Sequence, residues 1–357
     1  MALDTNRFVD GLIERGYSHL CVVPCSFAKN VINAVINNER IEYVPCASEA
    51  VAASVAAGLK MAGKKPIVIV QSSGVTNMGS NITSLLKPYG VTFPIITSWR
   101  TYKEGDSEIQ HQHLATELPR LIEAYGYEHT IVDQDDIEHA LDQIDQCDTT
   151  ETIAVLKKDT FTKVDLEPEH QLDLSTYTPR SAFLKALDEQ YADSDTLFIG
   201  TTGNTAREMY SYMPHTRNFY MAGNMGGALS LGLGAAKAGR KVIVCGGDAE
   251  FVMHMGGLAT AGRYKDEVDL TYLLFDNEQN KSTGGQNTYQ GHVDYIGIAR
   301  SSGLEVLEHT LEDLNEFDAQ MKEWEGKKGL RFMHIKCGID PETPRPPLDV
   351  VKTRTFA

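Results

Sequence analysis

The sequence has no apolar run of the roughly 20 residues that a helix needs to cross a bilayer. Basic residues are also scarce, because 33 Lys and Arg stand against 49 Asp and Glu, for a net charge of −16. That balance disfavours nonspecific binding to nucleic acid or to an anionic membrane. We therefore expect no nucleic-acid and no membrane partner, although the composition leaves room for a local basic pocket that binds a small anion.

The six cysteines lack the spacing of a zinc site and of a Cys-x-x-Cys redox pair. Most of them lie in or at the end of strand-like runs, which favours buried and reduced thiols. Residues 1–16 carry charges throughout and contain no apolar core of a signal peptide. These features predict a cytoplasmic protein.

The 357 residues, of which 42% are hydrophobic, suffice for two domains with separate cores. Short, continuous apolar runs alternate with helical stretches such as 50–62, 179–191 and 311–324. Continuous runs are typical of parallel strands that helices cover on both faces. The expected strands number six in each half: 19–25, 41–46, 66–71, 93–99, 129–133, 152–157, 196–200, 218–222, 241–245, 270–275, 305–309 and 330–336.

The two halves also repeat one pattern. Residues 58–65 and 234–241, which begin 176 residues apart, each read as the end of a small-residue helix with a Gly cap and basic residues before a buried strand. We therefore predict an α/β protein with two doubly wound, mainly parallel-sheet domains. The expected domains are 1–161 and 178–357, joined by an acidic linker at 162–177.

Polar clusters follow two of the expected strands in the second half. Gly247, Asp248 and Ala249 come after the run 241–245, and the cluster 276–279 comes after the run 270–275. Ligands of an open α/β sheet bind at this carboxyl edge. A carboxylate, an amide oxygen and a carbonyl make a half-shell that suits Mg²⁺ when phosphate oxygens supply the rest. A helix cap and an unrelated turn residue are the simpler alternative for each cluster alone.

The two clusters resemble the Gly-Asp-Gly … Asn-Asn signature of thiamine-diphosphate enzymes, with Ala249 and Asp276 as departures. The resemblance implies Mg²⁺ and thiamine diphosphate as cofactors, with one domain for the pyrimidine ring and one for the diphosphate. It implies that Asp248, Asn277 and the carbonyl of Gln279 hold the metal. Contacts with the cofactor are then expected from Gly203, Asn204, Thr205, Gly223, Met225, Gly247 and Ala249.

A glutamate in the first half takes the place of the activating carboxyl group of that family. Glu49 follows the run 41–46 and opens an Ala-rich helix. By the resemblance it exchanges a proton with a ring nitrogen of the pyrimidine. The alternative is a residue that stabilises a helix N-terminus. His111 and His113 are further catalytic candidates, which either orient the substrate and relay a proton or are solvated loop residues.

Segments over most of the chain, among them 71–77, 110–113, 201–208 and 276–286, are similar to the phosphonopyruvate decarboxylases, with the sulfopyruvate decarboxylases as relatives. This resemblance implies that a small anionic 2-oxo acid, 3-phosphonopyruvate, is decarboxylated to phosphonoacetaldehyde. Basic and hydroxyl side chains would bind the phosphonate. The expected substrate contacts are Ser73, Asn77, Arg100, Lys281, Ser282 and Thr283, where an inter-domain ion pair for Arg100 and a solvated side chain for Lys281 are the alternatives.

Three other functions stay open at this point: sulfopyruvate decarboxylation, another 2-oxo-acid decarboxylation or carboligation, and a catalytically inactive cofactor-binding subunit. The presence of Glu49, Asp248 and Asn277 argues against the last. Because the active site of the family lies between chains, we expect a homodimer or a larger homo-oligomer. The small-residue helices at 52–62 and 226–238 would allow close packing, either between chains or against their own sheets.

Overall fold

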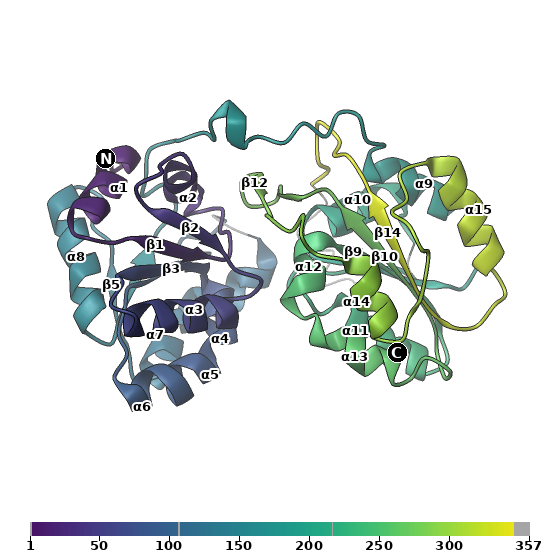
Figure 1. Ribbon diagram of the computed structural model, residues 1–357, viewed down its shortest axis with the longest axis horizontal. Coiled ribbons are helices and arrows are strands. Elements are labelled where there is room, and N and C mark those ends of the chain that lie inside the picture. The colour runs from purple at the N-terminus through teal and green to yellow at the C-terminus, as the bar shows by residue number, and fades with distance from the viewer. Residues whose placement is uncertain (1, 106–107, 216, 346–357) are drawn as a thin grey trace. The chain divides into compact units, whose positions relative to one another are not determined.

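A computed structural model describes residues 2–105, 108–215 and 217–345 (Figure 1). The chain forms two compact units. The first contains the residues up to Gln171 together with the segment 280–287, and the second begins at Leu172 and excludes that segment. The division at Gln171 falls inside the linker expected at 162–177. Met1 and residues 346–357, which the sequence assigns to the two domains, lie outside the described residues.

The first unit is built on a six-stranded sheet in which every neighbouring pair is parallel, in the order β2-β1-β3-β4-β6-β5. The strands are β1 (His19–Val22), β2 (Glu42–Pro45), β3 (Pro66–Gln71), β4 (Ile95–Ser98), β5 (Glu128–Ile131) and β6 (Thr152–Leu156). The α-helices are α1 (Thr5–Glu14), α2 (Lys29–Ile36), α3 (Glu49–Met61), α4 (Ser72–Asn77), α5 (Gly79–Asn81), α6 (Lys87–Tyr89), α7 (Gln112–Ala124) and α8 (Ile137–Thr149), with a π-helical turn at Ile82–Leu86 and 3₁₀ turns at Ile109–His111 and Pro168–His170.

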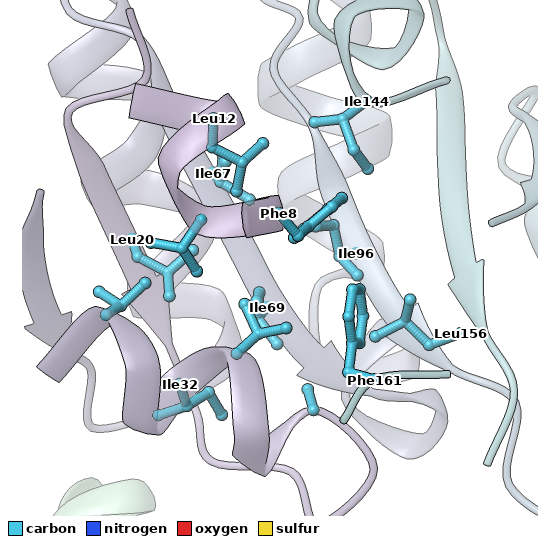
Figure 2. Packing of buried hydrophobic residues seen from close by; sticks show 14 of the residues in the cluster. Phe8, Leu12, Leu20, Ile32, Ile67, Ile69, Ile96, Ile144, Leu156 and Phe161 are labelled. Atoms are coloured by element: carbon cyan, nitrogen blue, oxygen red, sulfur yellow. The ribbon is translucent and has the colours of Figure 1, made fainter. Parts of the chain in front are cut away.

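Apolar side chains point to both faces of this sheet, because successive residues of a strand alternate between faces. Ile67 and Ile69 of β3 pack in one cluster with residues of α1, α2 and α8, among them Leu12 and Phe8 of α1 and Ile32 of α2 (Figure 2). Val68 and Val70 pack on the other face, under α3, α4 and α7. The continuous apolar run of β3 therefore reflects a strand that is buried on both sides.

The second unit repeats this plan with the parallel order β13-β14-β10-β9-β7-β8. Helices α9, α10 and α15 cover one face, and α11, α13 and α14 cover the other. The strands are β7 (Leu197–Gly200), β8 (Phe219–Tyr220), β9 (Lys241–Gly247), β10 (Asp269–Asp276), β13 (Glu305–Val306) and β14 (Leu330–Lys336). The helices are α9 (Arg180–Gln190), α10 (Asn204–Tyr212), α11 (Ala228–Lys237), α12 (Asp248–Met253), α13 (Gly256–Gly262), α14 (Tyr295–Ser301) and α15 (Leu314–Trp324).

The predicted fold class, two doubly wound parallel-sheet domains, is confirmed, and each expected strand forms within a few residues of its expected bounds. One element was not expected: a two-stranded sheet of β11 (Gln279–Asn280) and β12 (Gln286–Asn287). Its loop belongs to the first unit, where Nε2 of Gln286 donates to Oδ1 of Asn33 at 2.8 Å. Among the described residues, no helix is both long and apolar enough to span a membrane.

Candidate active site

Two neighbouring strands of the second unit end at the candidate metal ligands. In the parallel pairing of β9 with β10, Gly247 lies opposite Phe275, so that Asp248 and Asp276 follow at the same level. Asp248 begins α12 and is only 4% exposed, and Asn277, one residue beyond the end of β10, is also buried. The register therefore brings a carboxyl group and an amide group to one edge of the sheet.

Asp248 is a buried acid with an unusual proton affinity. Burial, reinforced by the negative charge of Asp276, raises the pKa of Asp248 to about 8. Oγ1 of Thr288 lies 3.4 Å from its Oδ2. A buried carboxylate is costly unless a cation balances it. In the described part of the chain no three His, Cys, Asp or Glu side chains gather as a metal cluster. A cation at Asp248 would thus take most of its ligands from elsewhere, which suits Mg²⁺ with phosphate oxygens.

The turn that carries Asn277 is held by two basic side chains of β14. Nε2 of His334 lies 3.0 Å from Oδ2 of Asp276, and Nζ of Lys336 lies 3.5 Å from the same oxygen. The other oxygen of Asp276 accepts the backbone N–H of Glu278 at 3.0 Å. Although burial opposes it, the hydrogen bond with His334 and the charge of Lys336 hold the pKa of Asp276 below its ordinary value.

Lys336 also contacts Glu278, with 2.5 Å between Nζ and Oε1. Glu278 has a φ of 52°, a left-handed conformation that costs about 1–3 kcal/mol for a residue other than glycine. Lys336 thus closes a strained turn, in which the N–H of Gln279 donates to Oδ1 of Asn277 at 3.3 Å. Sequence reasoning missed His334 and Lys336. Their signal is two basic residues with a period of two at the carboxyl end of a buried strand, β14, which also contains Arg331.

The loop between β7 and α10 offers a place for an anionic group. Thr201 has a buried hydroxyl group without a hydrogen-bond partner among the described residues. Within the described part of the chain, a Cβ added to Gly247 would meet only Cγ2 of Thr201, at 3.9 Å. Gly203 caps α10 with a φ of 92°, followed by Asn204 and the buried Thr205. The hydroxyl group of Thr201, the free space at Gly247 and the N-terminus of α10 together suit a ligand with many acceptor oxygens, such as a diphosphate.

The other expected cofactor contacts lie on neighbouring segments. Ala249 is the second residue of α12 and is partly buried. Gly223 and Met225 lie in the loop between β8 and α11 and are also partly buried. Asn204 uses its amide group to donate to Oγ1 of Thr343 at 3.2 Å.

Two buried polar pairs near this edge escaped the sequence analysis. Arg180 forms a bidentate pair with Glu208: Nε donates to Oε2 and Nη2 donates to Oε1, both at 2.8 Å. The charge of Arg180 favours the ionised form of Asp248. Glu250 accepts a hydrogen bond from Tyr272, and burial raises the pKa of Glu250 to about 7. These partners are 28 and 22 residues apart in the chain, so no local pattern indicates them.

In the first unit, Glu49 is the first residue of α3 and is only 4% exposed, which is rare for a charged residue. Oγ of Ser48 caps the helix by accepting the N–H of Val51 at 3.4 Å. Nδ2 of Asn77, at the end of α4, donates to Oε2 of Glu49 at 2.8 Å. Gly74 faces the same carboxyl group, and a Cβ there would lie 2.8 Å from Oε1. Helix α4 thus lies against the carboxyl group of Glu49, with Asn77 bonded to Oε2 and Gly74 facing Oε1.

Arg100 is paired within its own unit. Nη2 donates to Oε2 of Glu108 at 2.7 Å, and the guanidinium carbon lies 4.3 Å from the ring centre of Phe27. His111 is buried, with Nε2 3.9 Å from the same Glu108 oxygen. His113, in contrast, is exposed on α7. The two histidines, expected together, therefore occupy different environments.

The remaining expected substrate contacts also fall in the first unit. Ser73 lies on α4 and is partly buried. Lys281 and Ser282 are exposed in the loop between β11 and β12, and Oγ1 of Thr283 donates to the carbonyl of Asn280 at 3.1 Å. The structure thus joins Asn77 to Glu49, and Arg100 to His111 through Glu108.

Models of one protein family match both halves of the chain. The thiamine pyrophosphate enzyme N-terminal TPP binding domain matches residues 5–118, and the C-terminal TPP binding domain matches residues 199–335.

Three curated proteins are similar over most of their length. The chain is 30% identical to a phosphonopyruvate decarboxylase of Streptomyces viridochromogenes, over 86% of this chain and 82% of that protein. It is 29% identical to a phosphonopyruvate decarboxylase of Streptomyces hygroscopicus, over 93% and 87%. It is 25% identical to a sulfopyruvate decarboxylase of Methanosarcina acetivorans, over 92% and 90%.

Proposed function

Because this chain belongs to the thiamine pyrophosphate enzymes, in the group that includes phosphonopyruvate decarboxylase, we propose that it decarboxylates 3-phosphonopyruvate to phosphonoacetaldehyde and CO₂. The observation that carries the proposal is the pair of adjacent strand ends at which the buried Asp248 and Asn277 lie. Beside them is the hydroxyl group of Thr201, which has no hydrogen-bond partner among the residues that the structure describes. Thiamine diphosphate is the cofactor, and Mg²⁺ is our proposal for the metal.

When bound, the cofactor supplies the electron sink for loss of CO₂. The residues of the chain hold it and move its protons. Asp248, Asn277 and the carbonyl of Gln279 would ligate Mg²⁺, and the N–H groups at the start of α10 would meet the diphosphate. Glu49 would hold a proton on its carboxyl group for exchange with the pyrimidine ring. Its burial supports that role, because a dry carboxyl group transfers a proton without competition from water.

The substrate anion would be bound by basic and hydroxyl side chains. The guanidinium of Arg100 is already paired with Glu108. We propose that a phosphonate, with up to two negative charges, competes with that carboxylate for Arg100, since bidentate pairs with phosphate-like groups are strong. Lys281, Ser282 and Thr283 would add donors, and Ser73 would contact the oxo-acid end. Loss of one charge-assisted hydrogen bond costs roughly 1.5–3 kcal/mol, so that pyruvate should be a poor substrate.

The test is kcat/KM for phosphonopyruvate, sulfopyruvate and pyruvate on one preparation, with and without an acceptor aldehyde. We expect phosphonopyruvate to be preferred by about tenfold or more over each competitor. The 25% identity with a sulfopyruvate decarboxylase over 92% of the chain makes that reaction the second candidate, which a sulfopyruvate preference would establish. A carboligated product, or no turnover of any acid by cofactor-loaded protein, would contradict the proposal.

We also propose that two copies of the chain form the active site. Val51 and Val55 are exposed on α3, as are Leu231 on α11 and Met255 before α13. These exposed apolar side chains lie on helices that carry or adjoin site residues, and we propose that a second copy of the chain covers them. Location in a reducing cytoplasm is a separate proposal, supported by six cysteines that form no disulfide.

A further inference from the structure

Asn77 contacts Glu49, the side chain of the first unit to which we assign proton transfer. Its Nδ2 lies 2.8 Å from Oε2 of Glu49. We propose that Asn77 is a positioning residue, which occupies Oε2 as an acceptor so that Oε1 is the oxygen that carries and transfers the proton. This inference rests on the proposed function and assigns Asn77 to Glu49 rather than to the substrate.

The amide nitrogen of Asn77 determines which oxygen of Glu49 can be protonated. An amide nitrogen donates and does not accept, so the oxygen that faces it must offer a lone pair. A proton on the Glu49 carboxyl group is therefore directed to Oε1. The same hydrogen bond is stronger when the carboxyl group is ionised, which is its state after the proton has left. Asn77 would thus favour transfer as well as direct it.

The surroundings of Oε1 also depend on helix α4. Gly74 faces this oxygen, and a Cβ there would lie 2.8 Å from Oε1 and 2.7 Å from Cγ. Helix α4 therefore places the amide donor of Asn77 beside Oε2, and a glycine without a side chain beside Oε1. Both features come from one short helix that follows β3 directly, so the geometry of Glu49 depends on α4 as a unit.

An ordinary surface asparagine explains these contacts less well. Such residues usually bond to backbone groups close in sequence. Asn77 is exposed, yet its amide reaches a buried carboxyl group 28 residues away. A neighbouring asparagine reaches the same helix α3 over a similar distance in sequence but has no carboxyl partner there among the described residues: Asn81 donates to the carbonyl of Ala50 and to Oγ of Ser54, at 3.0 and 2.9 Å. Asn81 is therefore a matched control for the loss of an amide contact with α3.

The test follows exchange of the thiazolium C2 proton of bound thiamine diphosphate with deuterium, in the absence of substrate, by quenched-flow NMR. Asn77→Ala should slow this exchange by roughly one to two powers of ten, with cofactor affinity retained. Glu49→Gln sets the lower limit, and Asn81→Ala should exchange like the unchanged protein. Asn77→Asp has nearly the same shape but replaces the donor by an acceptor, and it should also slow the exchange.

The outcomes distinguish the role of Glu49 from the role of Asn77. Equal exchange in Glu49→Gln and in the unchanged protein would overturn the proton-transfer role that the proposed function gives to Glu49. Slow exchange in Glu49→Gln but normal exchange in Asn77→Ala would overturn only the role of Asn77. A raised KM for the acid with normal exchange would make Asn77 a substrate contact. If Asn77→Ala does not fold, normal exchange in Asn77→Asp would overturn the inference, and slow exchange would support it.

Discussion

Gly74 and Glu49 are in such close contact that position 74 has no room for a side chain. A Cβ there would lie 2.7 Å from Cγ and 2.8 Å from Oε1 of Glu49, distances that real Cβ atoms essentially never show. Either helix α4 or the carboxyl group must move if a methyl group is added.

We expect Gly74→Ala to keep thiamine diphosphate bound and to lose turnover by about tenfold or more, because displacement by a fraction of an ångström disturbs proton transfer. The overpacking should also cost about 1–3 kcal/mol of stability. Cofactor titration, kcat and thermal unfolding measure the three effects. Gly291→Ala is the control, since no atom of the described residues lies within 4 Å of its Cβ position. An unchanged kcat in Gly74→Ala would mean that the position of Glu49 does not limit the reaction.

Metal binding should release a proton at neutral pH. The pKa of Asp248 is about 8 in the metal-free protein, raised by burial and by the charge of Asp276, and a metal binds only the carboxylate. Below pH 8 the apparent affinity for Mg²⁺ with thiamine diphosphate should rise about tenfold per pH unit, and it should level off above. Calorimetry in buffers of different ionisation enthalpy counts the proton. Asp248→Asn should abolish that proton, and equal counts in both proteins would refute the assignment.

Lys336→Met should weaken Mg²⁺ binding by about tenfold or more, as is usual for residues that hold metal ligands in place. Lys336 contacts both Asp276 and Glu278, so its loss frees the turn that presents Asn277. Metal titration of the cofactor complex measures the change. Lys328→Met, at an exposed position, controls for the loss of one positive charge. Equal weakening in both variants would indicate a general effect of charge.

Chains with Glu49→Gln and chains with Asp248→Ala should complement each other if the site lies between two copies. Each homodimer lacks an essential group at both sites, whereas a mixed dimer regains one intact site. Random mixing at equal amounts should then restore roughly a quarter of normal activity. Mass spectrometry of intact dimers must show that subunits have exchanged. No recovery after proven exchange would place all essential groups of a site in one chain.

Cys46 should be the most reactive thiol. The hydrogen bond from Cys21 lowers the pKa of Cys46, although burial opposes the effect. Burial raises the pKa of Cys245 and Cys337 to about 12. Near pH 8 an alkylating reagent should therefore label Cys46 first, and peptide mapping over time shows the order. Cys46→Ser should remove the fast phase. Faster labelling of Cys245 than of Cys46 in the folded protein would contradict this order of thiol acidity.

Local patterns predicted the elements and the edge of the sheet. The apolar run of β3 has the predicted bounds, Pro66 to Gln71, because both of its faces are buried. Asp248 and Asn277 lie at neighbouring strand ends because parallel strands end at one edge. The contacts of Glu49 could not be predicted, since Asn77 lies 28 residues away and meets it only when α4 packs against α3. The docking of Gln286 on Asn33, 253 residues away, is beyond any periodicity.

The buried Asp248 at the start of α12 would link the lifetime of the protein in the cell to the supply of thiamine and magnesium. Asp248 is costly to bury while no cation balances it, so the empty chain unfolds more readily than the loaded one. Cellular proteases remove chains from the unfolded fraction. On the proposed function, a cell short of thiamine or magnesium would then lose the protein itself and not only its activity, and restoring the vitamin would require new synthesis before the reaction resumes.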